Sequence, residues 1–182
     1  MKLQAIKTLA IGGLGALALA ATYGAQAQPA PAAPLRPMGP PPPPARGPSL
    51  DLALEAAQTA LSTCKANGYN VTALVVDSAS VPKAGLVGDG AFAMTPQIAM
   101  RKAHTAVVFK KPSGAVGEEA KTNKALADQI AADQSLITWA GALPLVVGGE
   151  VIGAIGVSGA PGGDKDEACA TAGLAKIQDR LK

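Results

Sequence analysis

This chain has few of the side chains from which catalytic and metal sites are usually built. Its 182 residues include one histidine, two cysteines, one Trp, two Tyr and two Phe. There is no Cys-x-x-Cys pair and no second histidine, so a zinc site cannot be assembled from strong ligands alone. The basic residues form no stripe interleaved with aromatics, which gives no support to a nucleic-acid-binding role.

The chain also lacks an apolar run long enough to anchor it in a membrane. The apolar run 9–21 is shorter than the roughly 20 residues that a spanning helix needs. It follows two lysines and precedes Ala25-Gln26-Ala27, a small-x-small pattern typical of signal peptidase cleavage. The sequence therefore predicts a signal peptide over 1–27 and a periplasmic or secreted protein without stable membrane insertion after cleavage.

Proline dominates the next segment. Residues 28–48 contain ten of the fifteen prolines, including the run Pro40 to Pro44. Such a segment cannot bury a core, so we expect a disordered, polyproline-like linker. A proline-rich ligand for the groove of a partner protein is the alternative. The remaining residues, 49–182, are enough for one domain of ordinary size.

The rest of the chain alternates helical and strand patterns. Ser49 is a suitable helix cap, Thr95-Pro96 is typical of a helix start, and Asp164 with Glu167 predicts a capping box for the last helix. Tight turns join neighbouring strands, so we expect an α+β fold around an antiparallel sheet rather than a doubly wound one. The expected elements are a helix over 49–66, strands over 69–76 and 83–87, a helix over 95–110, a loosely helical stretch over 113–134, a hairpin over 144–159 and a helix over 164–181.

The hairpin carries the strongest local signal. Two runs rich in β-branched residues flank Gly148-Gly149, which predicts a tight primed turn. Gly153, Gly156 and Gly159 follow in the second strand at a spacing of three. No Lys-Ser/Thr follows them, so they do not form a phosphate loop. We expect these glycines to let the 95–110 helix or a neighbouring subunit lie close to the strand.

The two cysteines fall in the two terminal helices. An exported chain with an even number of cysteines favours a disulfide, here between Cys64 and Cys169. Small residues around both positions would let the helices approach each other closely. Two separate buried thiols are the alternative.

The 95–110 helix carries the one histidine. His104 lies one turn from Met100 on an apolar stripe, and a neutral imidazole in a pocket is a good iron ligand. Arg101 on the same helix is suited to pairing with ligand carboxylates. The alternatives are a surface or satisfied core histidine, or a triad with Ser158. The triad has little support because nothing around Ser158 is typical of a nucleophile elbow.

Several blocks of the chain resemble one known family. The blocks are Asp89-Gly90-Ala91, Lys102-Ala103-His104-Thr105-Ala106, Gly141-Ala-Leu-Pro144, the hairpin 148–159 and Lys165-Asp166-Glu167. From Ser49 onward, they resemble the GlcG/HbpS family of small haem-binding domains. The resemblance implies a profilin-like α-β-α sandwich with a five-stranded antiparallel sheet, assembled into homo-oligomers. It also implies non-covalent binding of haem or a related tetrapyrrole.

The resemblance also implies residue roles. One family member is described as contacting iron through a threonine of the central helix, and Thr105 matches that position; a related domain uses a histidine. Because His104 and Thr105 are adjacent, about 100° apart on a helix, we expect only one of them to face a pocket. The family commonly has an Arg-Met pair before its Asp-Gly-Ala, whereas this chain has Val87-Gly88, so Arg101 is the candidate replacement.

Two function classes follow from the sequence. We expect an exported protein that carries, buffers or senses haem without transforming it. The expected contacts are Met100, Arg101, His104 and Thr105, with iron bound by His104 or Thr105. The alternative is an enzyme or enzyme accessory that acts on a small organic acid of the glycolate type. Asp77 and Asp89 are its only candidate carboxylates near turns, where aspartate is common without any function.

Overall fold

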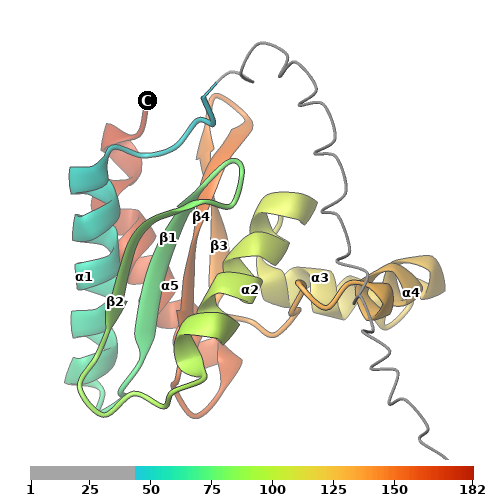
Figure 1. Cartoon of the computed structure of the whole chain (residues 1–182), viewed down its shortest axis with the longest axis horizontal. Coiled ribbons are helices and arrows are strands. Elements are labelled where there is room, and N and C mark those ends of the chain that lie inside the picture. Colours follow the sequence, from blue (N-terminus) through green and yellow to red (C-terminus); the bar gives the residue numbers. More distant parts are fainter. Residues whose placement is uncertain (1–43) are drawn as a thin grey trace, which may run out of the picture. The chain divides into compact units, whose positions relative to one another are not determined.

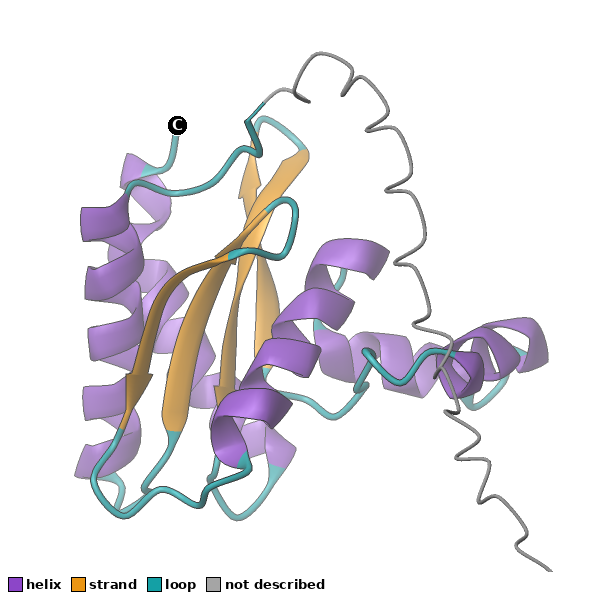
Figure 2. Ribbon diagram, in the orientation of Figure 1, coloured by secondary structure: helices purple, strands orange, loops and turns teal. Residues whose placement is uncertain are grey.

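The computed structural model describes residues 44–182, so the predicted signal peptide and most of the predicted linker lie outside the described residues. The described chain is an α+β sandwich built on an antiparallel four-stranded sheet with the order β2-β1-β4-β3. Figure 1 shows the arrangement, and Figure 2 shows how helices and strands alternate. The elements are α1 (Leu50–Ala66), β1 (Thr72–Asp77), β2 (Pro82–Val87), α2 (Thr95–Phe109), α3 (Ser113–Ala120), α4 (Lys124–Ala132), β3 (Ala142–Val147), β4 (Glu150–Ser158), α5 (Gly163–Ile177) and the short 3-10 helix η1 (Gln178–Arg180).

The expected five-stranded sheet is wrong, because the described chain has four strands. The fifth strand came from the family resemblance and not from the residue patterns, which predicted two pairs of strands. The segment between α2 and β3 forms the helices α3 and α4, which extend to the side of the sheet (Figure 1). No residue of α4 is buried, so this helix adds little to the core.

Alternating side chains of β1 belong to two separate apolar layers. Ala73 and Val75 pack with α1 and α5 on one face, whereas Leu74 and Val76 pack with α2 on the other. This period of two is the usual geometry of a strand buried on both faces. Much of the core is alanine, so the helices lie close to the sheet and to each other.

Two glycines make this close packing possible, as the sequence predicted for the hairpin. A Cβ on Gly156 of β4 would come 2.4 Å from the Ala99 carbonyl oxygen of α2. A Cβ on Gly173 of α5 would come 2.5 Å from the Ala56 carbonyl oxygen of α1. Both positions therefore need glycine because a backbone atom occupies the space of a side chain.

A disulfide joins the two helices on the outer face. Cys64 of α1 and Cys169 of α5 are bonded, with 5.6 Å between their Cα atoms, and this confirms the predicted pairing. The bond closes a sequence separation of 105 residues. It fixes the last turn of α1 to the first half of α5.

Helix starts follow the sequence signals only in part. Ser49 Oγ accepts a hydrogen bond from the Leu52 N–H, as predicted for the cap of α1. The predicted capping box is wrong, because α5 begins after Gly162 without a side-chain cap. Glu167 instead accepts a hydrogen bond from the Gly141 N–H at 3.3 Å, a tertiary contact that a local pattern cannot reveal.

Residues just before α1 already belong to the domain. The Arg46 carbonyl accepts a hydrogen bond from the Ser78 N–H at 2.8 Å, the Arg46 guanidinium pairs with Glu150, and Pro48 is buried. These contacts lie at the end of the sheet that carries the two hairpin turns (Figure 1). The chain therefore enters the domain at the end opposite the β2–α2 and β4–α5 loops.

Candidate functional site

A cavity of about 760 Å³ opens at the end of the sheet opposite the hairpin turns. We call it the α2–α5 cavity, because the first turns of α2 and α5 and the loops that precede them form much of its wall. The loop between α1 and β1 closes another side. Its larger apolar lining side chains are Tyr69, Phe92, Met94, Ile98 and Trp139, and its polar ones include Thr95, Lys102, Ser158 and Asp166.

Three side chains on this cavity are unusually exposed. Phe92, Met94 and Trp139 are 76%, 64% and 63% exposed, the highest values among the exposed large apolar side chains of residues 44–182. All three line the α2–α5 cavity. Single exposed apolar residues are ordinary, but a cluster around one cavity is typical of a binding surface. The arrangement predicts an apolar ligand or partner that covers them.

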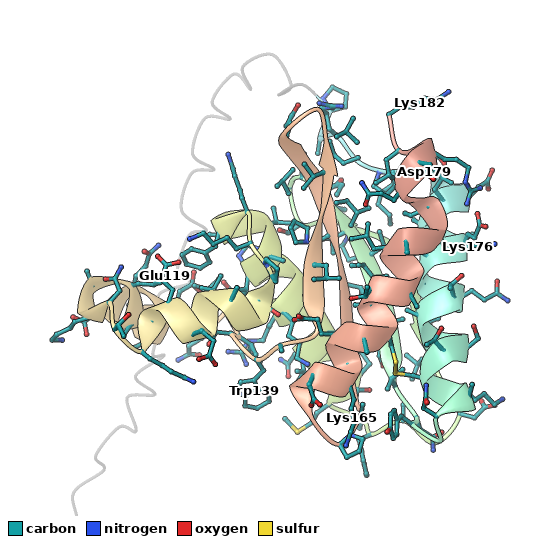
Figure 3. The ribbon with its side chains drawn as sticks, turned by 180° about the vertical axis from the view of Figure 1, so that it is seen from behind. Glu119, Trp139, Lys165, Lys176, Asp179 and Lys182 are labelled. Carbon is teal, nitrogen blue, oxygen red and sulfur yellow. A yellow bond between two sulfur atoms is a disulfide. The ribbon has the colours of Figure 1, made fainter. Side chains whose placement is uncertain are left out.

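Trp139 combines a fixed backbone with an uncovered ring. The buried Ser113 hydroxyl donates a hydrogen bond to the Trp139 carbonyl at 2.7 Å and accepts one from the Ala142 N–H at 3.1 Å. Figure 3 shows Trp139 and Lys165 at the end of the molecule where α5 begins. The indole is therefore held at the cavity by its main chain while most of its surface stays free for contact.

A buried ion pair forms the polar part of the cavity wall. Lys102 of α2 and Asp166 of α5 are 1% and 3% exposed, and the Lys102 Nζ donates to Asp166 Oδ2 at 2.7 Å and to the Val157 carbonyl at 3.1 Å. Asp166 Oδ1 accepts from the Ala160 N–H at 2.9 Å. Burial raises the pKa of the Asp166 carboxyl, and the hydrogen bond from Lys102 opposes that rise. One pair thus ties α2, α5 and the loop after β4 together.

His104 lies elsewhere on α2 and does not line the α2–α5 cavity. Its Nδ1 is 2.8 Å from Ser80 Oγ in the turn between β1 and β2. Ser80 has φ +61°, and Asp77 Oδ1 holds the turn by accepting hydrogen bonds from the Ala79 and Val81 N–H groups. A hydrogen bond to one ring nitrogen leaves the other, Nε2, as the atom that remains for a ligand.

Thr105 has its hydroxyl engaged inside the protein. The side chain is fully buried; the hydroxyl donates to the Arg101 carbonyl at 2.9 Å and accepts from the Ile137 N–H at 3.0 Å. These bonds fasten the segment before β3 to α2. A ligand contact at Thr105 would require at least one of them to be replaced.

Arg101 and Met100 serve two different parts of the structure. Arg101 donates to the Leu136 carbonyl at 3.0 Å, and its buried Nε has no hydrogen-bond partner among residues 44–182. Met100 packs on the apolar cluster between α2 and the sheet. Nearby, hydrogen bonds from Ser135 lower the pKa of Asp133, and the charges of His104 and Arg101 add to this effect. None of the four predicted contacts lines the α2–α5 cavity, and their assignment stays a prediction.

The sequence reasoning missed the residues that build the cavity. Phe92 and Met94 lie far from Trp139 along the chain, and the exposure of all three side chains cannot be read from spacing. A signal existed for the ion pair, because Lys102 and Asp166 each belong to a block that carried the family resemblance. A charged residue on the buried face of a helix indicates a paired partner.

Two kinds of feature are absent from the part of the chain that the structure describes. In residues 44–182, no helix is long and apolar enough to cross a membrane. Across the same residues, no three side chains among His, Cys, Asp and Glu gather into a group that could hold a metal ion.

Comparison with known proteins decides the family. A family model described as "Haem degrading protein HbpS-like" matches residues 49–175. The chain belongs to this HbpS-like family. Its predicted membership is confirmed, and the match covers the five α-helices and four strands of residues 44–182 except the last two residues of α5.

Solved structures agree with this HbpS-like assignment. The crystal structure of HbpS is 31% identical, with a TM-score of 0.67 over 78% of this chain and 97% of that one. A double mutant of Streptomyces reticuli HbpS is 32% identical, with a TM-score of 0.67 over 80% and 97%. A structure titled as a PduOC:heme complex is 22% identical, with a TM-score of 0.63 over 68% and 89%, and shows a shared fold. A search of curated proteins gave no match.

Proposed function

We propose that this protein binds haem non-covalently and that the α2–α5 cavity holds it. The observation that carries the proposal is the cluster of three exposed apolar side chains, Phe92, Met94 and Trp139, around one cavity of about 760 Å³. Membership of a family described as haem-degrading and a haem complex of a protein with the same fold support the choice of ligand.

The residues of the cavity fit such a ligand. Sites for small molecules commonly measure about 300–1,000 Å³ and are mostly apolar with a few polar groups. The α2–α5 cavity has this size, and an aromatic or thioether side chain stands on several of its sides. Tyr69 and Met94 offer an oxygen and a sulfur atom as iron ligands, and Lys102 places a cation in the wall.

When bound, haem supplies an iron centre and a strong visible absorption. The protein's own side chains would then bury the ring, exclude water from its faces and fix its orientation. Phe92 and Trp139 would contribute most of the newly buried apolar area, because they are large and mostly exposed. The fixed main chain of Trp139 would limit the entropy lost on binding.

The sequence-based contacts are the competing placement. Nε2 of His104 remains for iron because Nδ1 is bonded to Ser80. Thr105 is the weaker candidate, since its hydroxyl is already engaged on both sides. Arg101 and Met100 would accompany His104 in this placement, and the two placements predict opposite effects of substitution.

We propose export as the setting of this function, with the signal peptide over 1–27 and a carrier, buffer or sensor role for the mature protein. The disulfide between Cys64 and Cys169 supports an oxidising compartment. Amino-terminal sequencing of the mature protein after expression with its leader should give a chain that starts at Gln28. Retention of Met1 in a cytoplasmic product would contradict export.

We further propose that the mature protein is a homo-oligomer, as the family resemblance implies. Light scattering coupled to gel filtration tests this directly. A mass of at least two chains is expected, and the mass of one chain at micromolar concentration would contradict it.

Hemin titration of the mature protein tests the proposed function. We expect a shifted Soret band that saturates at a fixed stoichiometry. The double variant Phe92→Ser/Trp139→Ser should raise the Kd at least tenfold. Val81→Ser/Val146→Ser, which removes exposed apolar groups away from the cavity, is the matched control and should leave the Kd within twofold.

Two results would overturn the proposal or its details. Absence of any Soret shift would remove haem binding itself. Haem turnover is measured on the same sample after addition of a reductant and oxygen. Loss of the Soret band with release of iron would show an enzyme rather than a carrier. A stable Soret band supports binding alone.

A further inference from the structure

Tyr69 reaches the α2–α5 cavity from a fixed position between α1 and β1. Its N–H donates to the Cys64 carbonyl at 3.0 Å, and its half-buried side chain packs against the main apolar core. Cys64 is in turn bonded to Cys169. The phenol therefore belongs to one of the most restrained parts of the cavity wall.

The Tyr69 hydroxyl is not committed to the fold. Within residues 44–182, the only buried side-chain nitrogen or oxygen without a hydrogen-bond partner is Arg101 Nε. A Tyr69 hydroxyl without a partner is therefore not buried and reaches solvent. No side-chain hydrogen bond of the described chain involves this hydroxyl. Lys165 Nζ lies over the Tyr69 ring, 5.9 Å from the ring centroid, so a cation is next to the ring.

The other ligand-capable side chains of the cavity are less suitable. Thr95 Oγ1 is occupied, since it lies 2.8 Å from Thr72 Oγ1 and donates to the Phe92 carbonyl. The Lys102 Nζ is held by Asp166 and a carbonyl. Met94 is 64% exposed at the start of α2, and its thioether is a softer ligand than ferric iron prefers.

We infer that Tyr69 is the side chain that binds the haem iron, through its phenolate oxygen. On binding, an oxygen–iron bond forms to the ferric ion and the phenol proton passes to water. Tyrosine is an established type of haem ligand. The inference rests on the proposed function, because it needs haem in the α2–α5 cavity, and it assigns the iron to neither His104 nor Thr105.

Spectra of the ferric complex test the assignment. Wild-type protein with hemin should show the tyrosinate-to-iron charge-transfer band and phenolate vibrations in the resonance Raman spectrum. Tyr69→Phe should lose both signals and raise the Kd for hemin at least tenfold. His104→Ala, as the control outside the cavity, should keep both signals. A thermal melt of Tyr69→Phe within a few degrees of wild type establishes that the variant is folded.

The outcomes separate the inference from the proposed function. Haem binding without phenolate signals, or with signals that survive Tyr69→Phe, overturns the role of Tyr69 and leaves haem binding in place. Loss of binding in His104→Ala with an unchanged Tyr69→Phe overturns the role of Tyr69 and moves the iron to His104. Absence of haem binding by the wild-type protein overturns both.

Discussion

The two ends of α2 differ in how their side chains are used. At the amino-terminal end, Phe92 and Met94 precede or begin the helix with most of their surface exposed beside the α2–α5 cavity. Toward the carboxyl-terminal end, His104 and Thr105 are hydrogen-bonded to neighbouring segments of the fold. The first end has apolar surface without a partner, and the second has polar groups that already have partners.

This difference separates stability from binding along one helix. Substitutions near His104 and Thr105 should change the free energy of unfolding and leave ligand affinity unchanged. Substitutions at the exposed side chains of the cavity should do the reverse. Lys102 lies between the two sets and belongs to both, because it is buried in an ion pair and also lines the cavity.

The largest effect on the free energy of unfolding should come from loss of the disulfide between α1 and α5. Replacing both Cys64 and Cys169 by Ala should lower the free energy of unfolding by about 4–5 kcal/mol, because a closed loop of about 100 residues restricts the unfolded chain. Urea denaturation measures the change, with wild-type protein under reducing and oxidising conditions as the reference. A loss below about 1 kcal/mol would contradict this account of the cross-link.

Loss of the buried cation should be nearly as costly. Lys102→Met leaves Asp166 buried without its partner, and breaking such a pair typically costs about 3–5 kcal/mol. Lys121→Met, which breaks an exposed pair with Glu118, is the matched control and should cost less than about 1 kcal/mol. The double variant Lys102→Met/Asp166→Leu should regain much of the loss. Equal denaturation midpoints for Lys102→Met and Lys121→Met would refute the role of burial.

At the other end of α2, Thr105→Val should destabilise the fold by about 1–3 kcal/mol, because it leaves the Ile137 N–H without its acceptor. The Kd for hemin should not change. Thr171→Val is the control, since its exposed hydroxyl makes the same kind of bond to the carbonyl four residues earlier in α5. A Thr105→Val protein of normal stability that has lost haem would place the ligand at Thr105 instead.

The smallest effect is expected for His104→Ala. Its bond to Ser80 is half-buried, so its loss should cost about 1 kcal/mol and leave the Soret titration as in wild type. Ser80→Ala removes the same bond while it keeps the imidazole. If His104→Ala abolishes haem binding and Ser80→Ala does not, the iron is bound by His104. The claim that this end of α2 serves stability and not binding is then wrong.

Much of the fold was predictable because its signals are local. Ser49 caps α1, Gly148-Gly149 forms the turn between β3 and β4, and the cysteine pair is bonded as expected. Glycine in β4 does let α2 lie close to the sheet. The glycine that meets the Ala99 backbone of α2 is Gly156. Each of these follows from residues near in sequence or from a compartment argument.

The candidate site was not predictable in the same way. The cavity brings together the α1–β1 loop, the start of α2 and the segment before β3, and no spacing in the sequence encodes that meeting. His104 attracted the prediction because histidine is rare here and resembles a known ligand. Its actual neighbour is Ser80 in a turn 24 residues earlier, a contact that only the folded chain reveals.

Amide NMR spectra with and without hemin test the central claim most directly, because paramagnetic ferric iron broadens signals close to it. The account predicts broadening at the amides of Tyr69, Met94, Gly159, Ala160 and Gly162, with the hairpin turn at Gly148-Gly149 unaffected. Broadening centred on Ser80 and His104, with sharp signals around the α2–α5 cavity, would contradict it.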